Sequence, residues 1–315
     1  MLPSRVVLLA GVLATLLSSA PLSAAARSAS AGEEALPREQ DSVRVRRLTF
    51  SGARNGQAAL SPDGSRIAFV SNRDGSWQVW TIGREGREPR RVTTFDGALG
   101  GPAFTPDGTA VLFYSSTPDG YRIFEAPAHG GEPTLLPPLN AEAFRPRPSP
   151  AGELLVLDLV LPDDDGGHDI HVMRRSTGES TRLTTHPGYD SDARWSPDGT
   201  SIVFHSDRGS GEYRTQFYRM TARGEDLHPI PAGPAGNGYP AWSPDGTCIV
   251  YTSRLDGEPD LWVVGADGSD PRRLTYHPGF DGDPVWDPRG GAILFATDRF
   301  EGEELAWLQL DPAIA

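Results

Sequence analysis

One short phrase recurs six times along this chain and constrains its fold more than any other feature. Four copies read Ser/Thr-Pro-Asp-Gly, each with a hydrophobic residue before it and an apolar run after it. These four copies begin at Ser61, Thr105, Ser196 and Ser243, and two degenerate copies begin at Ser149 and Asp287. Successive prolines are 44, 44, 47, 47 and 44 residues apart, a period typical of four-stranded propeller blades.

The phrase has the chemistry of a tight turn. Serine or threonine opens the turn, proline presets φ, aspartate bonds to nearby backbone, and glycine accepts a positive φ. In the first unit an apolar run follows at 67–70, and further strand-like segments lie at 77–82 and 90–93. We therefore predict an all-β fold, a six-bladed β-propeller of four-stranded antiparallel blades over residues 43–311.

The two ends of the repeat region predict how the ring closes. A copy of the fourth strand, Arg46–Thr49, precedes the first turn phrase, whereas the last unit ends after 305–310 without a fourth strand of its own. We expect the N-terminal strand to complete the last blade, which leaves the ring without a long exposed edge.

The N-terminus has the features of an export signal. Arg5 precedes an apolar stretch at 6–17, and small residues follow it. We predict a signal peptide at 1–31, cleaved after Ala26 or Ala31, then a leader at 32–42 and, beyond the repeats, a tail at 312–315. The apolar stretch is too short for a stable membrane span, so we expect none after cleavage.

The net charge bears on the class of partner, and the cysteine content bears on whether a disulfide can form. The formal net charge of −13 excludes nucleic acid as the expected partner, because nucleic acid is bound through dense positive charge. The single cysteine, Cys248, lies in an apolar strand segment, which predicts a buried, inert thiol and no internal disulfide. We expect a monomer that is periplasmic or secreted.

The repeat units resemble a known family. Trp-Ser-Pro-Asp-Gly followed by an apolar strand and a Ser-Asp-Arg turn, as at 195–208, is similar to the propeller repeats of TolB-like proteins, and the resemblance covers residues 43 to 311. It implies a periplasmic, protein-binding propeller. TolB itself has an N-terminal α/β domain before its propeller, and we expect none here because too few residues lie outside the repeats. Similar blades also occur in prolyl-oligopeptidase-like enzymes, so the repeat specifies fold more than function.

One position in each unit is expected at the mouth of the central channel. Counting five places back from each repeat proline gives the residue that enters the innermost strand. The six residues are Gln57, Gly101, Arg145, Asp192, Tyr239 and Asp283. A polar set of this kind is either a binding rim or a set of residues that solvates the channel and bonds to neighbouring blades.

Two loops with the same His-Pro-Gly-aromatic-Asp phrase should lie on that face as well. Their histidines and acids could ligate a divalent metal, or the phrase could be purely architectural; we assign no metal ligand. The residues concerned are His186, Asp190 and Asp192 in one loop, and His277, Asp281 and Asp283 in its twin. The acidic run 163–169 lacks the alternating acids and distal glutamate of a helix–loop–helix calcium site, so we expect a solvated, lengthened hairpin turn.

The sequence favours a binding module over an enzyme. It contains no Gly-x-Ser-x-Gly elbow and no His-Glu-x-x-His helix motif, so we predict no catalytic residue and no cofactor. Our leading hypothesis is a scaffold of the cell envelope that binds a protein or peptide through the channel face. The alternative is a metal-assisted propeller enzyme of the lyase, lactonase or esterase type, acting on a small molecule or sugar acid. A third possibility is a regulatory propeller for a separately encoded hydrolase.

Overall fold

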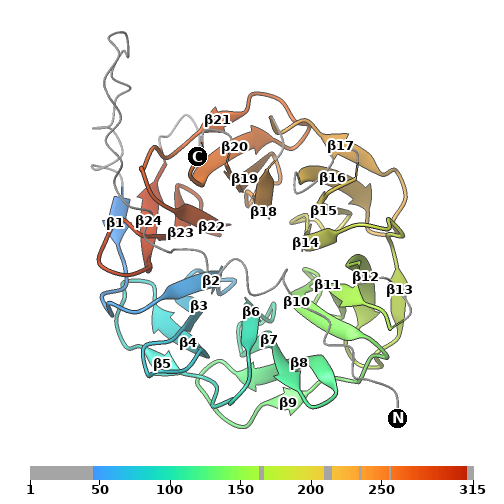
Figure 1. The fold of residues 1–315 in the computed structure, drawn as a ribbon, viewed down its shortest axis with the longest axis horizontal. Helices are drawn as coiled ribbons and strands as arrows, with labels where there is room; N and C mark the ends of the chain where they lie inside the picture. The colour runs from blue at the N-terminus through green and yellow to red at the C-terminus, as the bar shows by residue number, and fades with distance from the viewer. Residues whose placement is uncertain (1–44, 163–166, 209–214, 234–235, 255–256, 311–315) are drawn as a thin grey trace, which may run out of the picture. The chain divides into compact units, whose positions relative to one another are not determined.

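The computed structural model describes residues 45–162, 167–208, 215–233, 236–254 and 257–310. These residues form six four-stranded antiparallel sheets, arranged as the blades of a β-propeller (Figure 1). The predicted signal peptide, leader, C-terminal tail and the acidic residues 163–166 lie outside the described residues. Within the described part of the chain, no helical segment has the length and apolar character that crossing a membrane requires.

Each blade uses its strands in the same spatial order. The innermost strands are β2 (Asn55–Leu60), β6 (Leu99–Phe104), β10 (Glu142–Pro148), β14 (Asp190–Trp195), β18 (Asn237–Trp242) and β22 (Asp281–Trp286). The second strands are β3 (Arg66–Ser71), β7 (Ala110–Thr117), β11 (Leu154–Val160), β15 (Ser201–Ser206), β19 (Cys248–Ser253) and β23 (Ala292–Thr297). The third strands are β4 (Gln78–Gly83), β8 (Gly120–Pro127), β12 (Asp169–Arg174), β16 (Gln216–Thr221), β20 (Asp260–Gly265) and β24 (Glu304–Gln309). The outermost strands are β5 (Arg90–Arg91), β9 (Thr134–Leu135), β13 (Ser180–Arg182), β17 (His228–Ile230), β21 (Arg272–Arg273) and β1 (Val45–Arg47).

The predicted closure is confirmed. Strand β1 pairs antiparallel with β24 in the sheet β1-β24-β23-β22, with Val45 opposite Leu308 and Arg47 opposite Ala306. The next residue, Leu48, is 1% exposed and packs in the core between the sixth and first blades. The N-terminal strand therefore joins the last blade to the first.

The repeated turn works as its residue types predicted, and it also joins neighbouring blades. In the first blade the Ser61 hydroxyl donates to Asp63 Oδ1 at 2.6 Å, and Gly64 has φ +65°. Hydrogen bonds from Ser61 and Ser65 lower the pKa of Asp63 to about 2. A Cβ on Gly64 would lie 3.1 Å from Pro288 of the sixth blade. Glycine is therefore favoured here for two reasons: its positive φ and the close approach of Pro288.

The core lies between the blades. Second-strand side chains such as Phe69 of β3 and Leu294 of β23 are fully buried and belong to one cluster between the first and sixth blades. Both faces of each blade are covered in this way, which explains the continuous apolar runs of the second strands. Cys248 departs from its prediction: it is half-buried, because it is the first residue of β19 and lies next to an exposed turn.

Candidate functional site

The six predicted channel-mouth positions share one unusual backbone conformation. Each lies near the start of an innermost strand, where the pairing with the second strand shifts register at a β-bulge. Their φ angles are 49° at Gln57, 60° at Gly101, 49° at Arg145, 54° at Asp192, 55° at Tyr239 and 52° at Asp283. We call these six residues the channel-mouth collar. The innermost strands that carry them surround the centre of the ring (Figure 1).

Five members of the collar are not glycine, so their left-handed backbone is unfavourable. Such a conformation costs about 1 to 3 kcal/mol per residue and persists only where the surrounding structure enforces it. A bulge also redirects the side chain of the residue at which it occurs. The collar therefore holds specific side chains in directions that a regular strand would not provide.

Side chains of the collar reach the bulge of the next blade. Asp283 Oδ2 accepts the backbone N–H of Gln57 at 3.2 Å, and Gln57 Oε1 accepts the backbone N–H of Gly101 at 2.7 Å. Further around the ring, Arg145 Nε lies 3.0 Å from Asp192 Oδ1. These contacts join the sixth, first and second blades, and the third blade to the fourth, at the channel mouth.

Arg145 is committed to a buried network. Its Nη1 donates to Asp158 Oδ2 at 3.0 Å, to Ser191 Oγ at 2.8 Å and to the Tyr189 hydroxyl at 3.3 Å. Burial acts to lower the pKa of Arg145, but the carboxylates of Asp192 and Asp158 keep it well above its ordinary value. Asp158 is fully buried, and burial raises its pKa to about 6 against the opposing effect of Arg145.

Several residues of this network were not predicted from the sequence, although the repeat contains a signal for some of them. Eight places after the repeat prolines lie buried second-strand residues opposite the channel mouth, among them Tyr114, Asp158 and His205. His205 Nδ1 lies 3.8 Å from Asp192 Oδ2, and burial lowers the pKa of His205. Arg147 was also not predicted. Its Nη1 donates to the carbonyls of Gly101 at 2.9 Å and Pro102 at 3.0 Å, and burial lowers its pKa to about 10.

A row of rings lies beside these charges. It runs through Tyr114, Phe144, His168, Tyr189 and His205, with successive centroids 5.4, 5.5, 4.6 and 5.6 Å apart. Burial lowers the pKa of His168 to about 3, so this imidazole is neutral at ordinary pH. The row packs the second, third and fourth blades together around the network of Arg145.

On the opposite side of the mouth, two acids lie close together, and neither forms an ion pair with another described residue. Burial raises the pKa of Asp283 to about 6, and the nearby charge of Asp192 adds to this rise. Burial and the charge of Asp283 raise the pKa of Glu303, in the turn before β24, to about 7. Glu303 was not predicted from the sequence, but its place in a second-to-third turn puts it on the same face as the channel-mouth collar.

The two histidine loops are built alike, and each histidine meets an aspartate that was not among the candidate ligands. His186 Nε2 lies 3.1 Å from Asp207 Oδ1, and His277 Nε2 lies 3.0 Å from Asp298 Oδ1. The same aspartates accept the backbone N–H of Tyr189 and of Phe280, each at 2.8 Å. The shared phrase therefore has an architectural role in both loops.

The acids of these loops have their own partners. Asp190 Oδ2 accepts from Arg208, and Asp281 Oδ2 accepts from Arg299 at 2.5 Å. In the described ranges, no group of three or more His, Cys, Asp or Glu side chains is arranged so that it could hold a metal ion.

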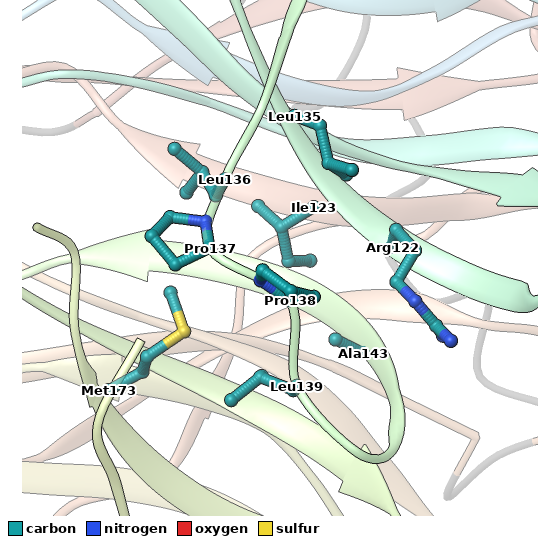
Figure 2. A pocket seen from close by; sticks show the side chains of 9 residues that line it. All are labelled: Arg122, Ile123, Leu135, Leu136, Pro137, Pro138, Leu139, Ala143 and Met173. Atoms are coloured by element: carbon teal, nitrogen blue, oxygen red, sulfur yellow. The ribbon is translucent and has the colours of Figure 1, made fainter. Parts of the chain in front are cut away.

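Two hollows lie away from the channel mouth, along the connection from β9 to β10. Figure 2 shows Pro137, Pro138 and Leu139 of this connection beside Ile123 of β8 and Met173 of β12. The space they enclose is about 10 Å³, room for about one water molecule. A wider hollow of about 330 Å³ adjoins it over the third blade, between the connection and strands β11 and β13.

The comparisons with known proteins agree with this architecture. A sequence model of the TolB beta propeller domain matches residues 39–158 and 138–236, more than half of the chain. The chain belongs to the TolB β-propeller family. Among solved structures, TolB from Acinetobacter baumannii superposes on this TolB-like propeller with a TM-score of 0.66 at 21% identity, over 80% of this chain. The match covers 65% of the Acinetobacter protein, so the chain spans less than two thirds of it.

Two other similar structures are a putative TolB and an oligogalacturonate lyase. A putative TolB from Agrobacterium tumefaciens has a TM-score of 0.64 at 19% identity, over 85% of this chain and 97% of its own. The oligogalacturonate lyase of Vibrio parahaemolyticus has a TM-score of 0.63 at 13% identity, over 86% and 94%. At these identities the likeness shows the fold alone, and the same fold carries different functions.

Proposed function

We propose that this TolB-like propeller is an exported protein of the cell envelope and acts as a scaffold that binds a protein or peptide through the channel mouth. The observation that supports it best is the channel-mouth collar. Five non-glycine residues adopt a left-handed backbone at equivalent bulges, and such outliers cluster at functional sites.

The collar also suits binding energetically. Contacts such as Gln57 to Gly101 and Arg145 to Asp192 join neighbouring blades, so the positions of these residues are fixed before any partner arrives. A preorganised surface loses little conformational entropy on binding, which leaves more of the contact energy as affinity. The half-buried side chains of Gln57, Tyr239 and Asp283 are the members best placed to touch a partner.

The contacts favour this function over metal-assisted catalysis on a small molecule or sugar acid. That alternative used His186 and His277 together with Asp192 and Asp283, as metal ligands or as general acid and base. Among the described residues no group of three or more His, Cys, Asp or Glu side chains is arranged to hold a metal ion, and Nε2 of each histidine is hydrogen-bonded to an aspartate.

The test is affinity capture from the native cell envelope with tagged residues 32–315. The variant Tyr239→Ala/Asp283→Asn changes two accessible collar residues and leaves the buried Arg145 network intact. The matched control is Glu153→Gln, an exposed acid beside a repeat turn on the opposite face. We expect an envelope protein that is retained by the wild type and by the control and lost by the collar variant. Equal retention by all three proteins, or by none, would refute binding through the channel mouth.

A further inference from the structure

Gly56 of β2 forms the floor of a small acidic cradle at the channel mouth. A Cβ built on Gly56 would lie 3.4 Å from Glu303 Oε1 and 3.6 Å from Asp283 Oδ2. The space above this glycine is therefore bounded by two carboxylates of the sixth blade, one from β22 and one from the turn before β24. We call Gly56, Asp283 and Glu303 the acidic cradle.

At two of the equivalent positions the space is already filled. A Cβ on Gly100 in the second blade would lie 2.6 Å from both the Tyr114 hydroxyl and Gln57 Oε1. A Cβ on Gly282 in the sixth blade would lie 2.5 Å from the ring of Phe280. Above Gly238 in the fifth blade the space is open, with His205 Nδ1 at 3.9 Å from a Cβ and nothing nearer. The cradle above Gly56 differs from all three because both of its neighbours are acids.

Among the described residues the two acids of the cradle form no ion pair, although the charge of Arg54 acts on Glu303 and the charges of Arg145 and Arg147 act on Asp283. Within the described residues, neither Asp283 nor Glu303 has an arginine or histidine nitrogen within ion-pair distance, and both side chains are half-buried. The single hydrogen bond to this pair of carboxylates comes from the backbone N–H of Gln57. Partly desolvated carboxylates without a partner cation are unfavourable.

An independent observation points to a missing donor at the same mouth. Asp192 is 3% exposed, and its Oδ2 has no hydrogen-bond donor. It occupies in the fourth blade the bulge position that Asp283 occupies in the sixth, and its charge acts on Asp283. A buried carboxylate oxygen without a donor is rare in folded proteins. The mouth thus has, besides the two acids of the cradle, a buried carboxylate oxygen that the described residues leave without a donor.

We propose that the acidic cradle binds a cationic nitrogen of the partner, either a primary ammonium or a guanidinium, which donates to Asp283 and Glu303 and is attracted by Asp192. This inference rests on the proposed binding function and adds the chemistry of the group that is recognised. Charge-assisted hydrogen bonds from ammonium or guanidinium to carboxylate are among the strongest available.

Binding of a cation there should also release protons. Burial raises the pKa of Asp283 to about 6 and of Glu303 to about 7, so part of the pair is protonated near neutral pH. A bound cation favours the ionised forms and lowers both pKa values. The other charged groups that act on the pair are Asp192, Arg145, Arg147, Arg54 and Asp298.

The experiment uses small probes on the mature protein. Nα-acetyl-lysinamide, Nα-acetyl-argininamide and glycinamide are titrated against residues 32–315 while the amide resonances of Gly56 and Gln57 are followed by NMR; Nα-acetylated citrullinamide, which carries no charge, is the neutral control. We expect the cations to shift these resonances and citrullinamide to leave them unchanged. A preference for glycinamide would indicate an amino terminus, and a preference for one of the other two would indicate a lysine or arginine side chain. Calorimetry near pH 6.5 in buffers of different ionisation enthalpy should detect the released protons.

Glycine variants make the test specific to the cradle. Gly56→Ala fills the space at ordinary contact distances, retains both acids and involves no positive φ, so it should fold and yet bind the cations roughly tenfold or more weakly. Gly238→Ala is the matched control, because its Cβ would lie 3.9 Å from His205 Nδ1 and meet nothing nearer. Glu303→Gln should also weaken binding, and the neighbouring exposed Glu301→Gln should not.

Two results would overturn the inference: equal shifts with citrullinamide, or equal weakening by Gly56→Ala and Gly238→Ala. Its failure can be told apart from failure of the proposed function. If capture depends on the collar but no cation binds the cradle, the scaffold function stands and the cationic partner group is wrong. If cations bind the cradle but no envelope protein is captured, the cradle stands and the protein-binding function is wrong.

Discussion

Replacing Arg145 tests whether the collar is held in place by its buried charges. In Arg145→Met the apolar part of the side chain is retained and the residue must still adopt φ +49°, so the backbone strain is little changed. The substitution removes the ion pairs of the guanidinium to Asp158 and Asp192, at 3.0 Å each, and its hydrogen bond to Ser191. Asp158, fully buried, is then left without its cation.

The expected loss of folding free energy follows from the burial of Asp158. Removing one partner of a buried ion pair typically costs about 3 to 5 kcal/mol. At about 2 to 4 °C per kcal/mol for a chain of this size, the Tm should fall by roughly 6 to 20 °C. Circular dichroism melts and urea titrations at pH 8 would measure both quantities. The double variant Arg145→Met/Asp158→Asn should recover part of the loss, because it removes the stranded charge.

The pH dependence gives a second check on the same variant. Burial already raises the pKa of Asp158 to about 6, and loss of Arg145 should raise it further. At about pH 5 the carboxyl should take up a proton and cease to be a buried charge, so the loss should be smaller there than at pH 8. A loss below about 1 kcal/mol at pH 8, the size expected for an exposed ion pair, would refute the structural role. Arg145 would then be available to a partner.

Three further outcomes are expected. Burial raises the pKa values of Asp283 to about 6 and Glu303 to about 7, above their ordinary values of 3.8 and 4.5, so the folded state binds these protons more tightly. Stability should therefore rise as pH falls from about 8 to about 5, and Asp283→Asn/Glu303→Gln should flatten that rise in urea titrations. Gly101→Ala should destabilise more than Gly233→Ala: both glycines have positive φ, but only at Gly101 would the Cβ meet backbone, 3.1 Å from Arg145 Cα; Tm values compare them directly. EDTA should leave the Tm unchanged, since no group of three or more His, Cys, Asp or Glu side chains in the described ranges is arranged to hold a metal ion; a fall reversed by one divalent metal would contradict this.

The repeat carried the prediction of the fold because each turn phrase specifies its own hairpin. The spacing of the prolines located the blades, and the extra copy at Arg46–Thr49 located the closing strand, since both features depend on local chain chemistry. The same spacing also located the collar, five places before each proline. The left-handed backbone there was not predictable, because residues such as Arg145 and Tyr239 disfavour it and adopt it only through contacts with neighbouring blades.

The site residues that sequence reasoning missed depend on such contacts between blades. Glu303 appeared as one acid among several in a turn, and only the packing of the sixth blade on the first places it beside Gly56. The same limit applies to His186 and His277. Their spacing to nearby acids suggested metal ligands, but the carboxylates that they meet belong to the following turn, 21 residues away in both cases.

The pairing of charges elsewhere in the ring explains why the acidic cradle is exceptional. In three blades a third-strand acid receives an arginine and a threonine from the fourth strand of the same sheet. The three sets are Glu304 with Arg47 and Thr49, Asp169 with Arg182 and Thr184, and Asp260 with Arg273 and Thr275. Each of these three blades thus supplies the cation for its own buried third-strand acid. Asp283 and Glu303 lie outside this scheme. A bound partner with a cationic nitrogen would supply the counter-charge that this scheme does not give them.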